Sequence, residues 1–330
     1  MKFQISNFRM KKSLKALTYS ILAIIIGINL IAFNHAYRFT HFSDSHSEKT
    51  KKPEELSLPE KIGVLFWGAS VPKPKNKKSP EAPFETSYFE GNGQLEGWLI
   101  PAENDNGVVI LFHGYASSKS SLLPYAAEFN KLGYSAFLVD LSGNGGSAGQ
   151  TTTLGFRESR DVAAAFALMK NRFPEDKLVL FGVSMGAVSI MKAVADFDIS
   201  PDQIIIESPF GSMRDAVYQR FSAMNVPAFP FADLLLFYGG LQSGFNAFAH
   251  RPVEYARSIS TKTLLSHGAK DRRVSRAEID EIFENLAGEK QLAVFENSGH
   301  EVFLKKDSTA WVAVVSSFLA GLSKKTPLKN

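Results

Sequence analysis

A single serine stands where an apolar stretch of the chain changes character. Residues 178–181 (LVLF) have the β-branched and aromatic composition of a buried strand, and residues 187–191 (AVSIM) resume with a helical pattern. Gly182 and Gly186 lie two positions to either side of Ser184, so that no Cβ atom crowds the tight turn between the two segments. Such a turn exposes the serine hydroxyl beside a helix N-terminus, which is a suitable place for a nucleophile.

Ser184 needs a general base, because a serine hydroxyl is a poor nucleophile until its proton is removed. His300 follows the apolar segment 290–297 and lies in a loop long enough to carry an imidazole over the edge of a sheet. Asp271 follows the preceding apolar segment, and a carboxylate there would hold the imidazole tautomer and stabilise the imidazolium. Glu207 is an alternative acid, and Asp140, which precedes the serine, is interpreted as a turn and packing residue rather than as the acid.

Acyl transfer also needs hydrogen-bond donors for the oxyanion that forms on the substrate. The backbone N–H of Met185 lies at the start of the helix that follows the serine, and that of Tyr115 follows the strand-like segment 107–114. We expect these two N–H groups to form the oxyanion hole.

Eight strand-like segments position these residues. The last six are apolar, and amphipathic helical patterns separate most of those six. The segments are 84–91, 94–100, 107–114, 134–143, 177–184, 203–210, 263–268 and 290–297, and the helical patterns cover 123–132, 155–173, 277–286 and 309–322. Strands that are apolar along their length and alternate with helices predict a parallel sheet covered on both faces. The first two segments are predicted to form a hairpin around residues 91–93.

The motifs, taken in this order, resemble those of the α/β-hydrolases, specifically the membrane-anchored serine hydrolases of the BEM46/ABHD type. They are His113-Gly114, residues 140–147, residues 182–186, residues 207–210, residues 267–271 and Gly299-His300. The resemblance covers about 84–322 and departs at 142–145, where Ser-Gly-Asn-Gly replaces the usual Arg-Gly-His-Gly. It implies an α/β fold with a mostly parallel eight-stranded sheet, helices on both faces and a small helical cap. It also supports a Ser184–His300–Asp271 mechanism that uses neither a cofactor nor a metal.

The N-terminal arm differs in composition from the body. Residues 16–34 carry no charge and follow five basic residues, which predicts a membrane-spanning signal anchor with residues 1–15 in the cytosol. A cleaved signal peptide would have the same pattern. Residues 35–83 are rich in Lys and Pro and are interpreted as an extended stem. The hydrolase domain (84–323) and a short tail (324–330) are then expected outside the cytosol, at the cell (inner) membrane.

Composition excludes several other functions. The chain has no cysteine, so it has neither disulfides nor a thiolate nucleophile. Residues 1–83 contain 14 Lys and Arg against 6 Asp and Glu, and the remaining 247 residues contain 23 against 27. The body therefore lacks the basic surface expected of a nucleic-acid enzyme. No metal-ligand spacing is present.

The substrate prediction depends on an aromatic insertion at about 211–260, interpreted as a cap. Phe210, Phe231 and Phe237 are candidate substrate-binding residues for a lipophilic acyl group, although they could equally serve only to pack the insertion onto the body. We expect an esterase, lipase or thioesterase that acts on a small-molecule or lipid ester at a membrane surface. A serine peptidase of the same fold and a non-catalytic binding protein are the alternatives.

Overall fold

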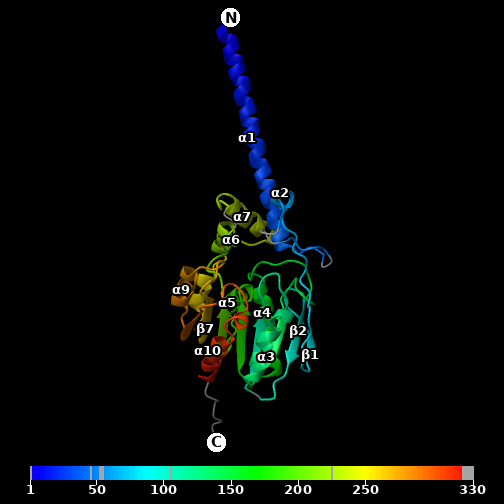
Figure 1. The fold of residues 1–330 in the computed structure, drawn as a ribbon, viewed down its shortest axis with the longest axis vertical. Helices are drawn as coiled ribbons and strands as arrows, with labels where there is room; N and C mark the ends of the chain where they lie inside the picture. The colour runs from blue at the N-terminus through cyan, green and yellow to red at the C-terminus, as the bar shows by residue number, and fades with distance from the viewer. Residues whose placement is uncertain (1, 45–46, 52–55, 105, 224–225, 322–330) are drawn as a thin grey trace.

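The computed structural model describes residues 2–44, 47–51, 56–104, 106–223 and 226–321. The body contains one eight-stranded sheet in the order β1-β2-β4-β3-β5-β6-β7-β8 (Figure 1). The strands are β1 (Glu85–Glu90), β2 (Gln94–Ile100), β3 (Val108–Phe112), β4 (Ser135–Asp140), β5 (Leu178–Val183), β6 (Gln203–Glu207), β7 (Thr263–Gly268) and β8 (Lys290–Phe295). β2 runs antiparallel to both neighbours, and the pairs from β4 to β8 are all parallel. The predicted fold class is confirmed.

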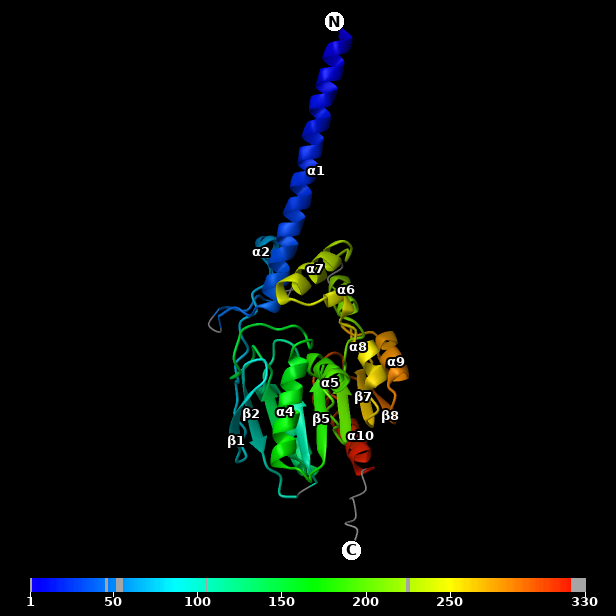
Figure 2. The same ribbon diagram turned by 180° about the vertical axis from the view of Figure 1, so that it is seen from behind.

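Helices cover both faces of the sheet, as Figures 1 and 2 show. They include α3 (Leu123–Lys131), α4 (Glu158–Arg172), α5 (Met185–Asp196), α9 (Arg276–Asn285) and α10 (Ser308–Ala320), with 3-10 turns at Lys119–Leu122 and Phe303–Lys305. Strand alternation assigns side chains to the two cores. In β3, Ile110 packs in the core that includes α4 and α5, and Leu111 packs in the core that includes α3 and α10.

The N-terminal arm is one long helix, α1 (Lys2–Thr40), which projects from the body in Figure 1. Its part from residue 12 to 40 is long and apolar enough to cross a membrane, and large apolar side chains such as Leu17 and Ile24 are exposed on it. The helix continues six residues beyond the predicted end of the anchor because 35–40 contains neither glycine nor proline.

The segment predicted as an extended stem contains a second helix, α2 (Leu58–Trp67). Pro59 stands in its first turn, and the Glu60 carboxylate accepts a hydrogen bond from the Ser57 N–H at 2.7 Å, a capping interaction that starts the helix. None of its residues is buried. The predicted tail, 324–330, lies outside the described residues.

The insertion after β6 forms two main helices, α6 (Met213–Ala223) and α7 (Phe231–Ser243), followed by short turns at Ala247–Ala249, Pro252–Tyr255 (α8) and Ala256–Ser258. α7 crosses the base of α1 in both views (Figures 1 and 2). The Tyr238 hydroxyl donates to Asn29 Oδ1 at 2.7 Å, and Gln242 Nε2 donates to the Phe33 carbonyl at 2.9 Å. The N-terminal arm and the insertion are therefore packed together.

Candidate active site

The turn between β5 and α5 holds Ser184 in a strained backbone conformation. Its φ of 52° and ψ of −111° lie in a region that non-glycine residues seldom adopt. Nearby backbone atoms leave no room for a side chain at either flanking position, which explains why both are glycine. A Cβ on Gly182 would lie 2.6 Å from the Gly186 carbonyl carbon, and a Cβ on Gly186 would lie 2.3 Å from the Phe112 oxygen. The turn is thus built to present the serine side chain.

Ser184, His300 and Asp271 form a continuous chain of hydrogen bonds. His300 Nε2 lies 3.0 Å from Ser184 Oγ, and His300 Nδ1 lies 2.8 Å from Asp271 Oδ2. The other carboxylate oxygen, Oδ1, accepts the backbone N–H groups of Arg273 at 2.7 Å and Val274 at 3.0 Å. Burial raises the pKa of Asp271, but the hydrogen bond and charge of His300, together with these N–H groups, outweigh it and lower the pKa below its usual range.

The two other acids considered from the sequence have different partners. Glu207 is fully buried and accepts hydrogen bonds from the Tyr125 hydroxyl and Trp311 Nε1, both at 2.6 Å. Burial raises the pKa of Glu207 to about 7. Asp140 pairs with the buried Lys119 ammonium at 2.5 Å. The structure therefore brings Asp271, and neither of these acids, to His300.

The two backbone groups expected to bind the oxyanion flank the serine. Tyr115 and Met185 line a cavity of about 110 Å³ together with Ser184 and His300. Within the described part of the chain, neither N–H donates a hydrogen bond, so both are free to bind a ligand oxygen. The Tyr115 ring stacks on Phe39 of α1 with centroids 4.8 Å apart, and its hydroxyl donates to the Phe39 carbonyl at 2.9 Å. The helix α1 thus supports the loop that carries one of these groups.

Of the three predicted substrate-binding phenylalanines, the structure brings only Phe210 to this cavity. Phe231 and Phe237 lie on α7 with exposed fractions of 37% and 53%, and they do not line it. The physical reason is that α7 turns Ala232 and Leu236 inward, which leaves the two phenylalanines outside. Hydrophobicity alone does not indicate which side of such a predominantly apolar helix is buried.

Two arginines that were not predicted from the sequence line the cavity beside the serine. Arg220 comes from α6, and Arg273 follows Asp271 in the loop after β7. The position of Arg273, two residues after the predicted acid, was a usable signal. No sequence signal pointed to Arg220, because it lies 36 residues from Ser184 on a helix without a recognisable motif.

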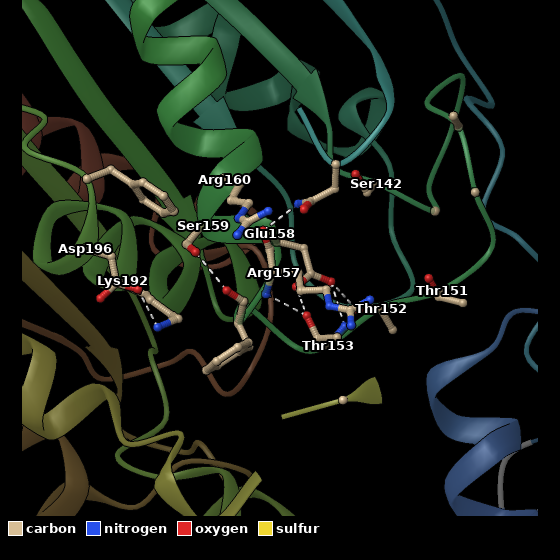
Figure 3. Close-up of a pocket in the computed structure, with 17 residues that line it drawn as sticks. Ser142, Thr151, Thr152, Thr153, Arg157, Glu158, Ser159, Arg160, Lys192 and Asp196 are labelled. Carbon is tan, nitrogen blue, oxygen red and sulfur yellow. Dashed lines mark hydrogen bonds and ion pairs between the residues drawn. The ribbon is translucent and has the colours of Figure 1, made fainter. Parts of the chain in front are cut away.

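A larger cavity of about 840 Å³ lies beside α4 and α5 (Figure 3). Figure 3 shows its polar side chains bonded mainly to one another. Glu158 accepts hydrogen bonds from the hydroxyl groups of Thr152 and Thr153, both at 2.6 Å, and Lys192 pairs with Asp196 at 2.6 Å. We interpret this network as one that holds the 142–153 loop on α4.

An open, mostly parallel eight-stranded sheet with a serine in the sharp turn after its fifth strand is the architecture of the α/β-hydrolase fold, and this chain has that fold. Residues 103–235 match the family described as serine aminopeptidase, S33.

Among related proteins, the chain is 26% identical to the uncharacterized protein YqkD of Bacillus subtilis over 235 residues, which cover 70% of this chain and 77% of YqkD. It is also 26% identical to the lysophosphatidylserine lipase ABHD12 of Mus musculus over 192 residues, 56% of this chain and 46% of the lipase. The chain thus spans about half the length of that lipase. The esterase Pf2001 of Pyrococcus furiosus has the same fold, with a TM-score of 0.65 and 22% identity over 76% of this chain and 96% of the esterase.

Proposed function

We propose that the protein is a serine hydrolase that cleaves carboxylic esters or thioesters through an acyl-enzyme. The observation that supports this most directly is the bonded order Asp271–His300–Ser184, with contacts of 2.8 and 3.0 Å. These distances are within the range over which a base can take the proton of a nucleophile. The lowered pKa of Asp271 supports an ionised carboxylate at neutral pH.

Each residue then has a defined role. Asp271 accepts the Nδ1–H of His300, which leaves the Nε2 lone pair directed at the Ser184 hydroxyl. As Ser184 Oγ attacks the carbonyl carbon, His300 takes its proton, and the N–H groups of Tyr115 and Met185 stabilise the oxyanion. His300 next protonates the leaving alcohol or thiol. A water molecule, deprotonated by His300, finally releases the acid and restores Ser184.

The leaving group could be an alcohol, a thiol or an amine. The similarity to a lysophosphatidylserine lipase supports an ester of a lipophilic acyl group, and the match to serine aminopeptidases supports a peptidase as the second candidate. A panel of 4-nitrophenyl esters, acyl thioesters and aminoacyl 4-nitroanilides distinguishes them. The candidate with the highest kcat/KM is the class that the enzyme uses.

The decisive experiment on the mechanism is Ser184→Ala, with Ser316→Ala on the exposed face of α10 as a matched control. We expect S184A to lose fluorophosphonate labelling and at least about 10³-fold of its 4-nitrophenyl butyrate turnover, and S316A to keep both. Undiminished turnover by a folded S184A protein would contradict the proposal and leave a non-catalytic binding protein as the explanation.

We further propose that α1 is an uncleaved, single-pass signal anchor and that the body lies outside the cytosol at the cell membrane. The uncharged residues 16–34 form about 28 Å of helix, close to the thickness of a hydrocarbon core. The helices α2 and α7 flank the base of α1 (Figures 1 and 2). Both expose large apolar side chains, which suit the membrane interface. They are Leu58, Ile62, Leu65, Phe66 and Trp67 on α2, and Phe231, Phe237 and Leu241 on α7.

This location is tested by extraction and by a reporter. Alkaline carbonate should leave the protein in the membrane, and a reporter fused after Asn330 should be active only outside the cytosol. Recovery of the protein in the soluble fraction, or a reporter active in the cytosol, would contradict the proposed topology.

A further inference from the structure

The cavity beside Ser184 is lined by two arginines and by no aspartate or glutamate. Arg220 enters it from α6 in the insertion, and Arg273 enters from the loop that carries Asp271. Most of the other lining groups are apolar, such as Leu154 and Phe210. The cavity therefore carries excess positive charge directly beside the proposed nucleophile.

Neither arginine is neutralised by a carboxylate in the described part of the chain. The Arg220 guanidinium lies instead over two aromatic rings, 4.4 Å from the centre of Phe39 and 5.4 Å from that of Tyr115. Stacking on rings orients a guanidinium while its N–H groups stay available to an anion. Burial lowers the pKa of Arg220 to about 10, which still leaves it protonated at neutral pH.

The size of the cavity limits what it can hold. At about 110 Å³ it is smaller than an apolar cavity of about 150 Å³ that holds one benzene molecule. A carboxylate or a phosphate group fits this space, whereas a long acyl chain does not. An acyl chain must therefore extend out of the cavity.

We propose that Arg220 and Arg273 recognise an anionic group, a carboxylate or a phosphate, located a few bonds from the scissile carbonyl. The substrate is then an anionic acyl ester. Planar guanidinium groups bind both anions through paired N–H donors. This inference rests on the proposed function, since it places the anion relative to the bond that Ser184 attacks.

The test compares substrates that differ only in charge. The 4-nitrophenyl monoester of glutaric acid carries a carboxylate, and the 4-nitrophenyl ester of glutaric acid monoamide is its neutral isostere. We expect the wild-type protein to prefer the acid by about tenfold or more in kcat/KM, the size expected for a charge-assisted hydrogen bond. Arg220→Gln should remove most of this preference. Arg272→Gln, which removes an exposed charge that does not line the cavity, should keep it.

A second arm identifies the source of the charge. Hydrolysis of an acylglycerol phosphate, compared with the acylglycerol of the same chain length, tests a phosphate on the alcohol side of the ester. Preference for the phosphate with none for the glutarate acid places the anion on the leaving group, and the reverse places it on the acyl group. Either preference supports the proposal, provided that the R220Q protein no longer shows that preference.

Two results would overturn the inference without touching the proposed function. One is a wild-type protein that hydrolyses charged and neutral partners equally. The other is an R220Q protein that loses activity on both equally, because Arg220 would then only support Tyr115. If R220Q does not fold, Arg273→Gln on the exposed loop gives the same comparison. Failure of the proposed function itself would appear differently, as neutral-ester turnover that survives S184A.

Discussion

Replacing Asp271 with asparagine changes one proton position and keeps the shape of the site. Oδ1 of Asp271 accepts two backbone N–H groups, at 2.7 and 3.0 Å, so the asparagine must place its carbonyl oxygen there. Its NH₂ group then occupies the position of Oδ2, 2.8 Å from His300 Nδ1. Because the NH₂ group donates, Nδ1 must accept, and the ring proton moves to Nε2.

The consequence for catalysis follows from the second contact. Nε2 lies 3.0 Å from Ser184 Oγ, and once it carries the proton it can no longer accept that of the serine. A triad with the wrong tautomer loses about 10⁴-fold in kcat, equivalent to about 5.4 kcal/mol of transition-state stabilisation. We expect a loss of this size for Asp271→Asn in 4-nitrophenyl butyrate hydrolysis at pH 7.

Asp280→Asn serves as the matched control, since Asp280 pairs with Arg276 on the exposed surface of α9. It should keep wild-type kcat. Circular dichroism and thermal melting check that both variants are folded. A folded D271N protein with kcat within tenfold of the wild type would refute the tautomer reasoning, and would mean that His300 is oriented by something other than Asp271.

Two further predictions concern stability. Gly186→Ala should destabilise the protein by about 1–3 kcal/mol and reduce activity at least tenfold, because the new Cβ would lie 2.3 Å from the Phe112 oxygen. Gly239→Ala should not destabilise it, because a Cβ there would meet no atom within 4 Å outside the neighbouring backbone of its own helix. Chemical denaturation and ester hydrolysis measure both effects, and an equally stable, active G186A protein would contradict the close backbone approach. The pKa of Glu207 rises from 4.5 to about 7 on folding, mainly through burial, so between these pH values the folded state holds a proton that the unfolded state releases. The free energy of unfolding should therefore fall as the pH rises from about 4.5 to about 7. The Glu207→Gln variant should lack this part of the pH dependence when its melting temperature is measured across the range. A pH dependence of E207Q equal to that of the wild type would contradict the prediction.

Local patterns in the sequence were sufficient for the fold and for the order of the proposed catalytic residues. The central strands β3, β5, β6 and β7 are apolar along most of their length because both of their faces are covered, and this composition is visible in the sequence. The glycines around Ser184 are likewise a local requirement of the turn. Asp271 and His300 could be found because parallel strands bring their C-terminal ends to one edge of the sheet.

Contacts between distant segments needed the tertiary structure. Which side of α7 is buried depends on its packing against α1 and the body. Most residues of α7 are apolar and do not gather on one face, so the sequence could not exclude Phe231 and Phe237 from the cavity. Two contacts depend on how the arm and the insertion pack over the sheet. One is the contact between Phe39 of α1 and Tyr115, and the other is the entry of Arg220 into the cavity. Such packing is decided by the complementarity of whole surfaces, which no short stretch of sequence contains. The sequence thus determined the proposed chemistry of the site, and the tertiary structure alone decided the charge and size of the space beside Ser184.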